Sequence, residues 1–246
     1  MKRAYLIVIA AVVLGLGLAV LSVPSLLAND KDENTIKMFD RDSVVYGRTF
    51  GEWEAEWNQW SYSIPVAQYP LFDNGDCNVG QSGPVWFLGG KFCAVGATCS
   101  YTAVRNCSVP SGKAIFFPIA DFEDSTLEEA VNVHPSDPTY QQIGTLRSVT
   151  SSVEGATDIF CQIDGRKVKN LAQKFSVQST AFGFTIPDDN LLKAVYAPPN
   201  NFEAGSYFPA VDDGYYLMLA PMSPGMHTLH FGASWLDVTY NLTIAK

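Results

Sequence analysis

Residues 214–245 read GYYLMLAPMSPGMHTLHFGASWLDVTYNLTIA, and this stretch decides the fold class. From Leu236 to Ile244 apolar residues alternate with polar ones, in the order LDVTYNLTI. A period of two places all the apolar side chains on one face of a half-buried antiparallel strand. Two further strands flank the turn Ser223-Pro224-Gly225. The C-terminal part of the chain is therefore predicted to be a run of antiparallel strands.

Strand patterns continue upstream of this stretch. The sequence VWFL at 85–88 is a short apolar run, as expected of a strand covered on both faces. The sequence AIFFPI at 114–119 follows a turn at Pro110–Lys113 and predicts a strand that ends in acidic residues. Asp164-Gly165 is a strong hairpin signal. A long strand is predicted at 174–187, with a bulge near Ala181 where its inward phase shifts.

Helical patterns are fewer. Thr49 and Glu52 have the spacing of a capping box, which predicts a helix over 50–62. Two further helices are predicted over 124–133 and 138–153. Together these patterns predict a mainly β fold, an antiparallel β-sandwich of about seven or eight strands with about three peripheral α-helices.

The N-terminus predicts export. Lys2 and Arg3 precede an apolar run over residues 5–28, which is typical of a signal peptide. The run is about 36 Å long as a helix, enough to cross a hydrocarbon core of about 30 Å, so a retained N-terminal anchor helix is the alternative. Either reading puts the rest of the chain outside the cytoplasm. We predict a signal or anchor at 1–28, a flexible tether at 29–45 and one domain at 46–246.

The composition excludes some classes of function. The formal net charge is −9 and no run of Lys or Arg occurs, which argues against nucleic acid as a partner. Hydrophobic residues make up 47% of the chain, enough for a sizeable core. No dinucleotide-binding or phosphate-loop glycine pattern is present, so we predict no cofactor.

Five cysteines fit an oxidising compartment, where disulfides are the usual outcome. Cys93 and Cys99 are close enough to bridge one short loop, and Cys77 and Cys107 would close a larger loop around it. Cys161 lies in the apolar segment DIFCQI and is predicted to be free and buried. Other connectivities remain compatible with the spacing.

Candidate catalytic residues are few. Asp121 and Glu123 follow the AIFFPI segment, and two acids at a strand end suit glycoside hydrolysis. His134, in a loop, is a further candidate general base. His227 and His230 are three apart on a predicted strand and so point to opposite faces. They therefore predict no shared metal site.

Two acidic turns are weak calcium candidates. They are Asp73-Asn74-Gly75-Asp76 and Asp212-Asp213-Gly214, and neither has the spacing of an EF-hand loop. Both are turn-forming sequences first.

Three tryptophans form a stripe on the predicted helix at 50–62. Trp53, Trp57 and Trp60 fall within an arc of about 60° at 100° per residue. Burial in the core is the first interpretation, because together they would expose an unusually large apolar patch. The alternative is a ligand-binding platform that uses Trp57 and Trp60.

Five segments in the same order resemble a group of exported bacterial and archaeal proteins of unknown function. They are GRTFGEWEAEWNQWSYSIP, CNVGQSGPVWFLGG, CSVPSGKAIFFPI, DGYYLMLAPMSPGMHTLHFG and DVTYNLTI. The resemblance covers about residues 46–246 and implies that Cys77 pairs with Cys107. It brings no known activity, so it assigns no catalytic residue.

Two functions follow as hypotheses. The first is a non-enzymatic extracytoplasmic domain, secreted, periplasmic or on the cell surface, that binds a glycan or a protein partner of the cell envelope. It would touch the membrane only through residues 5–28, if these are retained. The alternative is a hydrolase of extracellular polymers that uses Asp121 and Glu123 as acid and base.

Overall fold

Two β-sheets form the framework of the structure, a computed structural model that describes residues 26–27, 37–134, 136–199 and 201–246. In the seven-stranded sheet the order is β1-β2-β10-β5-β3, and β8 and β9 also pair with β10. Its strands are Leu26–Leu27 (β1), Met38–Phe39 (β2), Val85–Phe87 (β3), Ala114–Ser125 (β5), Ser176–Gln178 (β8), Phe182–Ile186 (β9) and Gly205–Leu219 (β10). The 15-residue β10 is thus the strand around which this sheet is built.

The five-stranded sheet has the order β4-β12-β11-β6-β7. Its strands are Thr102–Val109 (β4), Phe160–Ile163 (β6), Arg166–Lys167 (β7), Gly225–Ala233 (β11) and Leu236–Ile244 (β12). The alternation read from the sequence is confirmed in β12, where every apolar residue is buried. The Asp164-Gly165 hairpin is confirmed between β6 and β7, and both turn residues have positive φ, at 51° and 75°.

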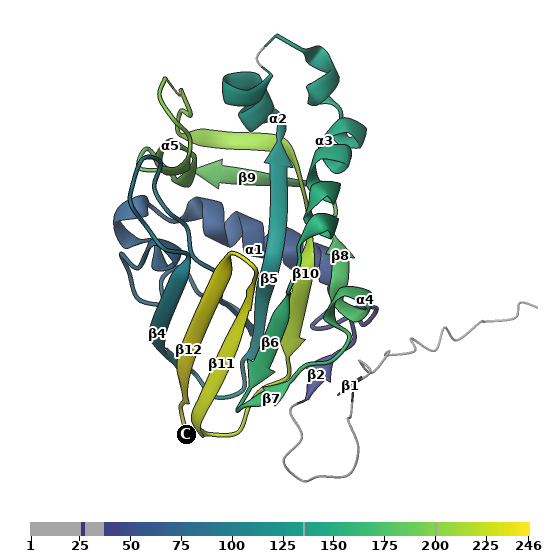
Figure 1. The fold of residues 1–246 in the computed structure, drawn as a ribbon, viewed down its shortest axis with the longest axis vertical. Helices are drawn as coiled ribbons and strands as arrows, with labels where there is room; N and C mark the ends of the chain where they lie inside the picture. Colours follow the sequence, from purple (N-terminus) through teal and green to yellow (C-terminus); the bar gives the residue numbers. More distant parts are fainter. Residues whose placement is uncertain (1–25, 28–36, 135, 200) are drawn as a thin grey trace, which may run out of the picture.

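In the described part of the chain, five α-helices accompany the sheets (Figure 1). They are Phe50–Ser63 (α1), Thr126–Glu128 (α2), Ile143–Thr150 (α3), Leu171–Phe175 (α4) and Leu191–Val195 (α5). A π-helical turn, Glu129–Val133, continues α2, and short 3₁₀ turns cover Val66–Gln68, Pro70–Phe72, Pro138–Gln141 and Ser151–Gly155.

The mainly β prediction is confirmed, but the purely antiparallel prediction is wrong. Strand β3 runs parallel to β5, and β4 runs parallel to β12. The described residues also form more strands than predicted, because strands of two or three residues such as β1, β2, β7 and β8 are too short to show a period. Residues 174–187 are two strands rather than one, and β10 changes register opposite the gap between them.

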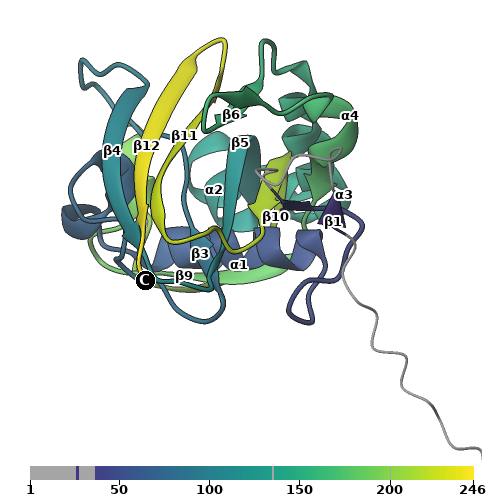
Figure 2. The ribbon, with the colours of Figure 1, turned by 90° about the horizontal axis from the view of Figure 1, so that it is seen from below.

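Two hydrophobic clusters fill the interior. One lies between the seven-stranded sheet and α1, and the other contains residues of both sheets. Figure 2 shows this order from below, with β4, β12, β11 and β6 on one side of β5 and β10 and with α1 on the other. Along β5, Phe116 faces α1, whereas Ile115 and Phe117 face the five-stranded sheet. Strands β5 and β10 are therefore covered on both faces.

Residues 37–45, predicted to belong to a flexible tether, are part of the fold. Met38 pairs with Leu219 of β10, and Phe39 and Val45 are buried. The export segment and the first part of the tether, residues 1–25 and 28–36, lie outside the described residues. Within the described part of the chain, no helix is both long and apolar enough to span a membrane.

The helix α1 begins at the predicted capping box. The Glu52 amide donates to Thr49 Oγ1 at 3.3 Å, and the Thr49 amide donates to Glu52 Oε2 at 2.7 Å. These two hydrogen bonds satisfy amides that have no partner inside the helix. The helix ends at Ser63, two residues before Pro65.

The tryptophan stripe of α1 belongs to the core. Trp53, Trp57 and Trp60 are 3%, 2% and 7% exposed. Their indole N–H groups donate to backbone carbonyls at 2.7–3.0 Å, those of Val45, Leu88 and Val79 respectively. The first interpretation therefore fits the structure, and the ligand-platform alternative does not, because Trp57 and Trp60 expose almost no ring surface.

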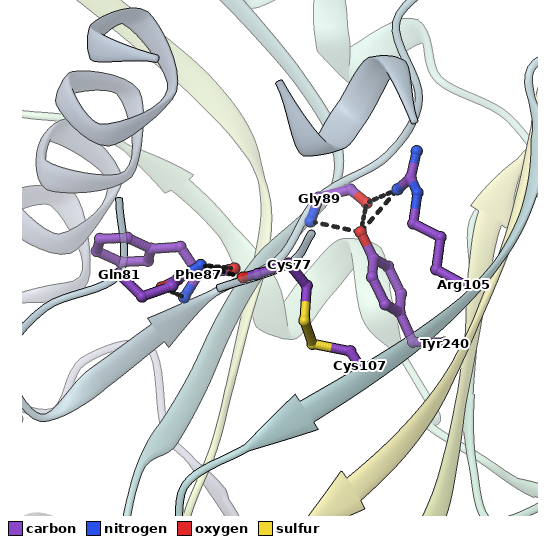
Figure 3. The surroundings of a disulfide bond; sticks show 7 residues. All are labelled: Cys77, Gln81, Phe87, Gly89, Arg105, Cys107 and Tyr240. Atoms are coloured by element: carbon purple, nitrogen blue, oxygen red, sulfur yellow. Dashed lines mark hydrogen bonds between the residues drawn. A yellow bond between two sulfur atoms is a disulfide. The ribbon is translucent and has the colours of Figure 1, made fainter. Parts of the chain in front are cut away.

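Two disulfides close loops in the first half of the domain. Cys77 is bonded to Cys107 and Cys93 to Cys99, and Cys161 is free and buried, all as predicted. The longer bridge fastens the loop before β3 to β4 (Figure 3). Burial raises the pKa of the Cys161 thiol, so it is an inert core residue.

Polar side chains fix the segment around β3 (Figure 3). The Gln81 amide donates to the carbonyl of Phe87 at 2.7 Å and accepts from its N–H at 2.8 Å, as a neighbouring strand would. Arg105 donates to Tyr240 Oη at 2.7 Å, and this hydroxyl donates to the carbonyl of Gly89 at 2.8 Å. Side chains thus hold the last residue of β3 and the segment that follows it.

We predict that Trp57→Ala lowers the free energy of unfolding by about 3–5 kcal/mol, because it leaves a large cavity and an unpaired carbonyl. Urea denaturation measures the loss. The matched control is Trp235→Ala, whose side chain is 52% exposed and whose loss should change stability by only about 0.5 kcal/mol. Equal effects of the two substitutions would contradict the core assignment.

Candidate functional site

Five carboxyl groups meet where α1 crosses β5 and β10. They form the carboxyl cluster, which consists of Glu54 of α1, Asp121 and Glu123 of β5, Glu128 of α2 and Asp212 of β10. Asp121 lies opposite Gly214 and Glu123 opposite Asp212 in the β5–β10 pair. Residues two apart on a strand share a face, so the two predicted acids both point toward α1.

A β-bulge decides this orientation. Tyr215 pairs with Ala120, but Tyr216 pairs with Pro118, so β5 has one extra residue at Ile119. Before the bulge, the odd-numbered residues of β5 face the five-stranded sheet. After it, the odd-numbered residues Asp121 and Glu123 face α1. Without the bulge, both carboxyls would point away from α1.

Glycine at position 214 leaves room for the side chains of Asp121 and Tyr216 between β5 and β10. A Cβ atom there would lie 2.6 Å from the Tyr216 ring and 3.0 Å from Asp121 Cβ. A side chain at this position would therefore push Asp121 and Tyr216 apart.

Glu54 is the most isolated member of the cluster. It is 0% exposed, and neither of its carboxyl oxygens has a hydrogen-bond partner. Burial raises the pKa of Glu54 well above its usual value, and Asp212, Asp213 and Asp121 raise it further. The site therefore favours the protonated form of this side chain.

Asp212 is held by two donors. The Asn58 amide, one helical turn after Glu54, donates to Asp212 Oδ2, and Tyr216 Oη donates to the same oxygen at 2.7 Å. Asp212 Oδ1 has no partner. Burial raises the pKa of Asp212 to about 6 although the two hydrogen bonds act in the opposite direction.

Glu123 and Glu128 form the other end of the cluster. Tyr62 Oη donates to Glu123 Oε2. Glu128 accepts from Tyr196 Oη at 3.0 Å and from Ser125 Oγ at 2.7 Å. Burial and the neighbouring Glu128 raise the pKa of Glu123 well above its usual value. Two close carboxyls with raised pKa values are able to share one proton.

The opposite face of β10 carries an ion pair. Arg147 of α3 donates to Asp213 Oδ1 at 3.2 Å and to the carbonyl of Asp212 at 3.0 Å. Thr150 Oγ1 donates to Asp213 Oδ2 at 2.6 Å. Arg147 also lowers the pKa of Glu54. The charge of Arg147 thus offsets part of the repulsion among these acids.

The other catalytic candidate, His134, makes its contacts with residues other than Asp121. Its Nδ1 hydrogen-bonds with Glu129 Oε2, and its ring stacks on Tyr140 with centroids 3.6 Å apart. The neighbouring Asp124 is buried, and burial together with Glu128 raises its pKa to about 8. The carboxyl partner of His134 is thus Glu129, directly after α2, and not Asp121.

Among the described residues, no group of three or more His, Cys, Asp or Glu side chains is arranged to hold a metal ion. Asp73, from the first calcium candidate, contacts Lys91 at 2.8 Å and Arg105 at 2.7 Å. His227 and His230 have separate partners, Asp164 and Asp237, each at 2.8 Å.

A surface cavity of about 350 Å³, here called the aromatic cavity, lies beside the cluster. It is lined by Asp121, Phe122, Ser152, Val153, Gly155, Ala156 and Trp235. Phe122 and Trp235 are 42% and 52% exposed. Asp121 is the one residue common to the cavity and the carboxyl cluster. The sequence analysis did not identify Phe122, Ser152 or Trp235.

One sequence signal for the cavity exists. Trp235 occupies the tight turn between β11 and β12, and about half of its surface is exposed. A tryptophan in a two-residue hairpin turn is a candidate for exposure. The cavity itself joins three distant segments, so no local pattern predicts it.

Comparisons of the chain with protein-family models, with curated proteins and with solved structures find no match.

We predict that Arg147→Leu destabilises the fold by about 3–5 kcal/mol at neutral pH, because it leaves Asp213 buried without its counter-charge. Chemical denaturation measures the change. Arg48→Leu is the control, since its ion pair with Glu56 is exposed on both sides and should contribute at most about 1 kcal/mol.

Adding Asp213→Asn to Arg147→Leu should recover part of the lost stability, because the second substitution removes the unpaired charge. A double variant no more stable than Arg147→Leu would show that the carbonyl contacts of Arg147, and not the charge, are what matters.

Proposed function

We propose that this chain is an extracytoplasmic, non-enzymatic β-sandwich domain that binds a sugar residue of a glycan in the aromatic cavity. The observation that carries the proposal is the exposure of Trp235 and Phe122 at one hollow in the surface. Large aromatic side chains are usually withdrawn from water, and an exposed pair beside a cavity is typical of a binding site.

The chemistry of the cavity suits a sugar ring. Aromatic faces pack against the C–H groups of a pyranose, and hydroxyl or carboxyl groups bind its hydroxyls. Ser152 and Asp121 supply polar groups beside the apolar Val153 and Ala156. Its volume of about 350 Å³ fits a ligand of one or two rings.

The two disulfides support an extracytoplasmic location. Disulfides persist in oxidising surroundings such as the periplasm and the cell exterior, where glycans are also found. The resemblance to exported proteins agrees with this location. A protein of the cell envelope is the other kind of partner, and it becomes an outcome of the binding experiment.

A hydrolase is the second candidate, and one observation favours it. Asp121 lines the cavity, and burial together with Asp212 raises its pKa well above the usual value. An acid that stays protonated beside a substrate site is able to act as a general acid. Glu123, its proposed partner, hydrogen-bonds with Tyr62 beneath α1 and does not line the cavity. The cavity thus lacks the second acid of the proposed pair, which favours binding over hydrolysis.

We predict that the domain retains glycans on an array, and that Trp235→Ala weakens binding about 10-fold or more, because it removes the largest aromatic surface of the cavity. Trp235→Phe should keep most of the affinity. Val104→Ala is the matched control, since Val104 is 74% exposed on β4, away from the cavity residues.

The outcomes separate the candidates. Release of product from a bound glycan, abolished by Asp121→Asn with binding kept, would favour the hydrolase. Binding of envelope protein in place of any glycan, still sensitive to Trp235→Ala, would favour a protein partner. Full glycan affinity in the Trp235→Ala variant would reject the cavity as the binding site.

A further inference from the structure

Glu54 is a buried acid for which the fold supplies no partner. It lies in the second turn of α1, is 0% exposed, and has no hydrogen bond to either oxygen. Asp212 of β10 and Asp121 of β5 point toward α1, and Asp213 and Arg147 act on Glu54 from the ion pair on the opposite face of β10. The strands β8 and β9, which also pack against α1, have the sequences SVQ and FGFTI and carry no titratable group. Three acids thus raise the pKa of Glu54, and Arg147 lowers it.

An ionised Glu54 would be costly in this position. Burying a carboxylate without a counter-charge costs several kcal/mol, and neighbouring carboxylates add repulsion. Arg147 is already engaged with Asp213 and with two backbone carbonyls. A protonated Glu54 removes the charge and becomes a hydrogen-bond donor. Asp212 Oδ1, the unpartnered oxygen of the facing carboxyl, is the kind of acceptor it needs.

We propose that Glu54 binds a proton in the folded protein, and that this proton holds α1 against β5 and β10, so that losing it at alkaline pH loosens the helix from the sheet. The proposal adds a regulatory property to the domain and does not depend on the identity of any ligand. It rests on the position of Glu54 among Asp121 and Asp212, with both of its oxygens unpaired.

The direction of the effect follows from linkage. In the unfolded chain Glu54 and Asp212 ionise near the ordinary carboxyl pKa of about 4. Burial raises the folded pKa of both side chains, so the folded state binds more protons than the unfolded state above that pH. Stability is therefore greatest in mild acid and is lost as the pH rises through the folded pKa values. Glu123 and Glu128 add in the same direction, because burial also raises their pKa values.

The test is thermal unfolding of the full domain at about pH 5.5 and about pH 8.5. We expect the wild-type Tm to be roughly 3–8 °C lower at the higher pH. In Glu54→Gln, which carries the same shape without the titrating proton, this difference should shrink by about half or more. Glu56→Gln is the matched control, because Glu56 lies two residues away on the same helix in an exposed ion pair, and it should keep the wild-type difference.

A second measurement needs no substitution and decides the question if Glu54→Gln fails to fold. Hydrogen exchange on the wild type, corrected for intrinsic rates, compares α1 with β12. We expect α1 amides to lose protection about 10-fold or more at the higher pH, while β12 amides change by about 3-fold or less. A wild-type Tm that is flat or rises with pH, an equal pH difference in Glu54→Gln, or parallel exchange in α1 and β12 would each overturn the proposal.

Discussion

The packing of α1 against β5 and β10 is the contact on which the rest of the structure depends. One side of the helix supplies the tryptophan stripe, whose indole groups reach carbonyls in three separate loops. The other side supplies Glu54, Asn58 and Tyr62, which meet the carboxyl cluster. A helix that is buried on both sides gains hydrophobic stabilisation but must satisfy or neutralise its polar groups. Figure 2 shows why: α1 lies across the face of β5 and β10 that the five-stranded sheet leaves uncovered.

The bulge in β5 separates two environments along one strand. Before the bulge, the side chains of β5 alternate between two apolar layers, with Phe116 toward α1 and Phe117 toward the other sheet. After the bulge, Asp121 and Glu123 point toward α1, and the exposed Phe122 points toward the aromatic cavity. Asp121, directly after the bulge, belongs to both sites. The carboxyl cluster and the cavity are therefore neighbours because one extra residue in a strand shifts the phase of everything after it.

Local patterns predicted the parts of the fold that local physics controls. The capping box at Thr49, the positive-φ turn at Asp164-Gly165 and the alternation of β12 each depend on residues within a few positions of one another. Asp121 and Glu123 were identified as candidates because acids after an apolar strand are visible in the sequence. Their neighbour Glu54 was not identified, because in the sequence it looks like any surface glutamate of a helix. Its burial becomes visible only when β10, about 160 residues later, lies beneath it.

The sequence by itself determined the mainly β class and the capped helix at 50–62 and made the short Cys93–Cys99 bridge the natural pairing, because periodicity, capping and short loop closure are local. The tertiary structure alone decided the parallel pairing of β3 with β5 and of β4 with β12, because an alternating strand carries no mark of its partner's direction. It alone decided which acids share a site and which aromatic side chains stay in water, because both depend on contacts between segments far apart in the chain. Trp57 and Trp235 are the same residue type, and only their neighbours make one a core residue and the other a candidate ligand contact.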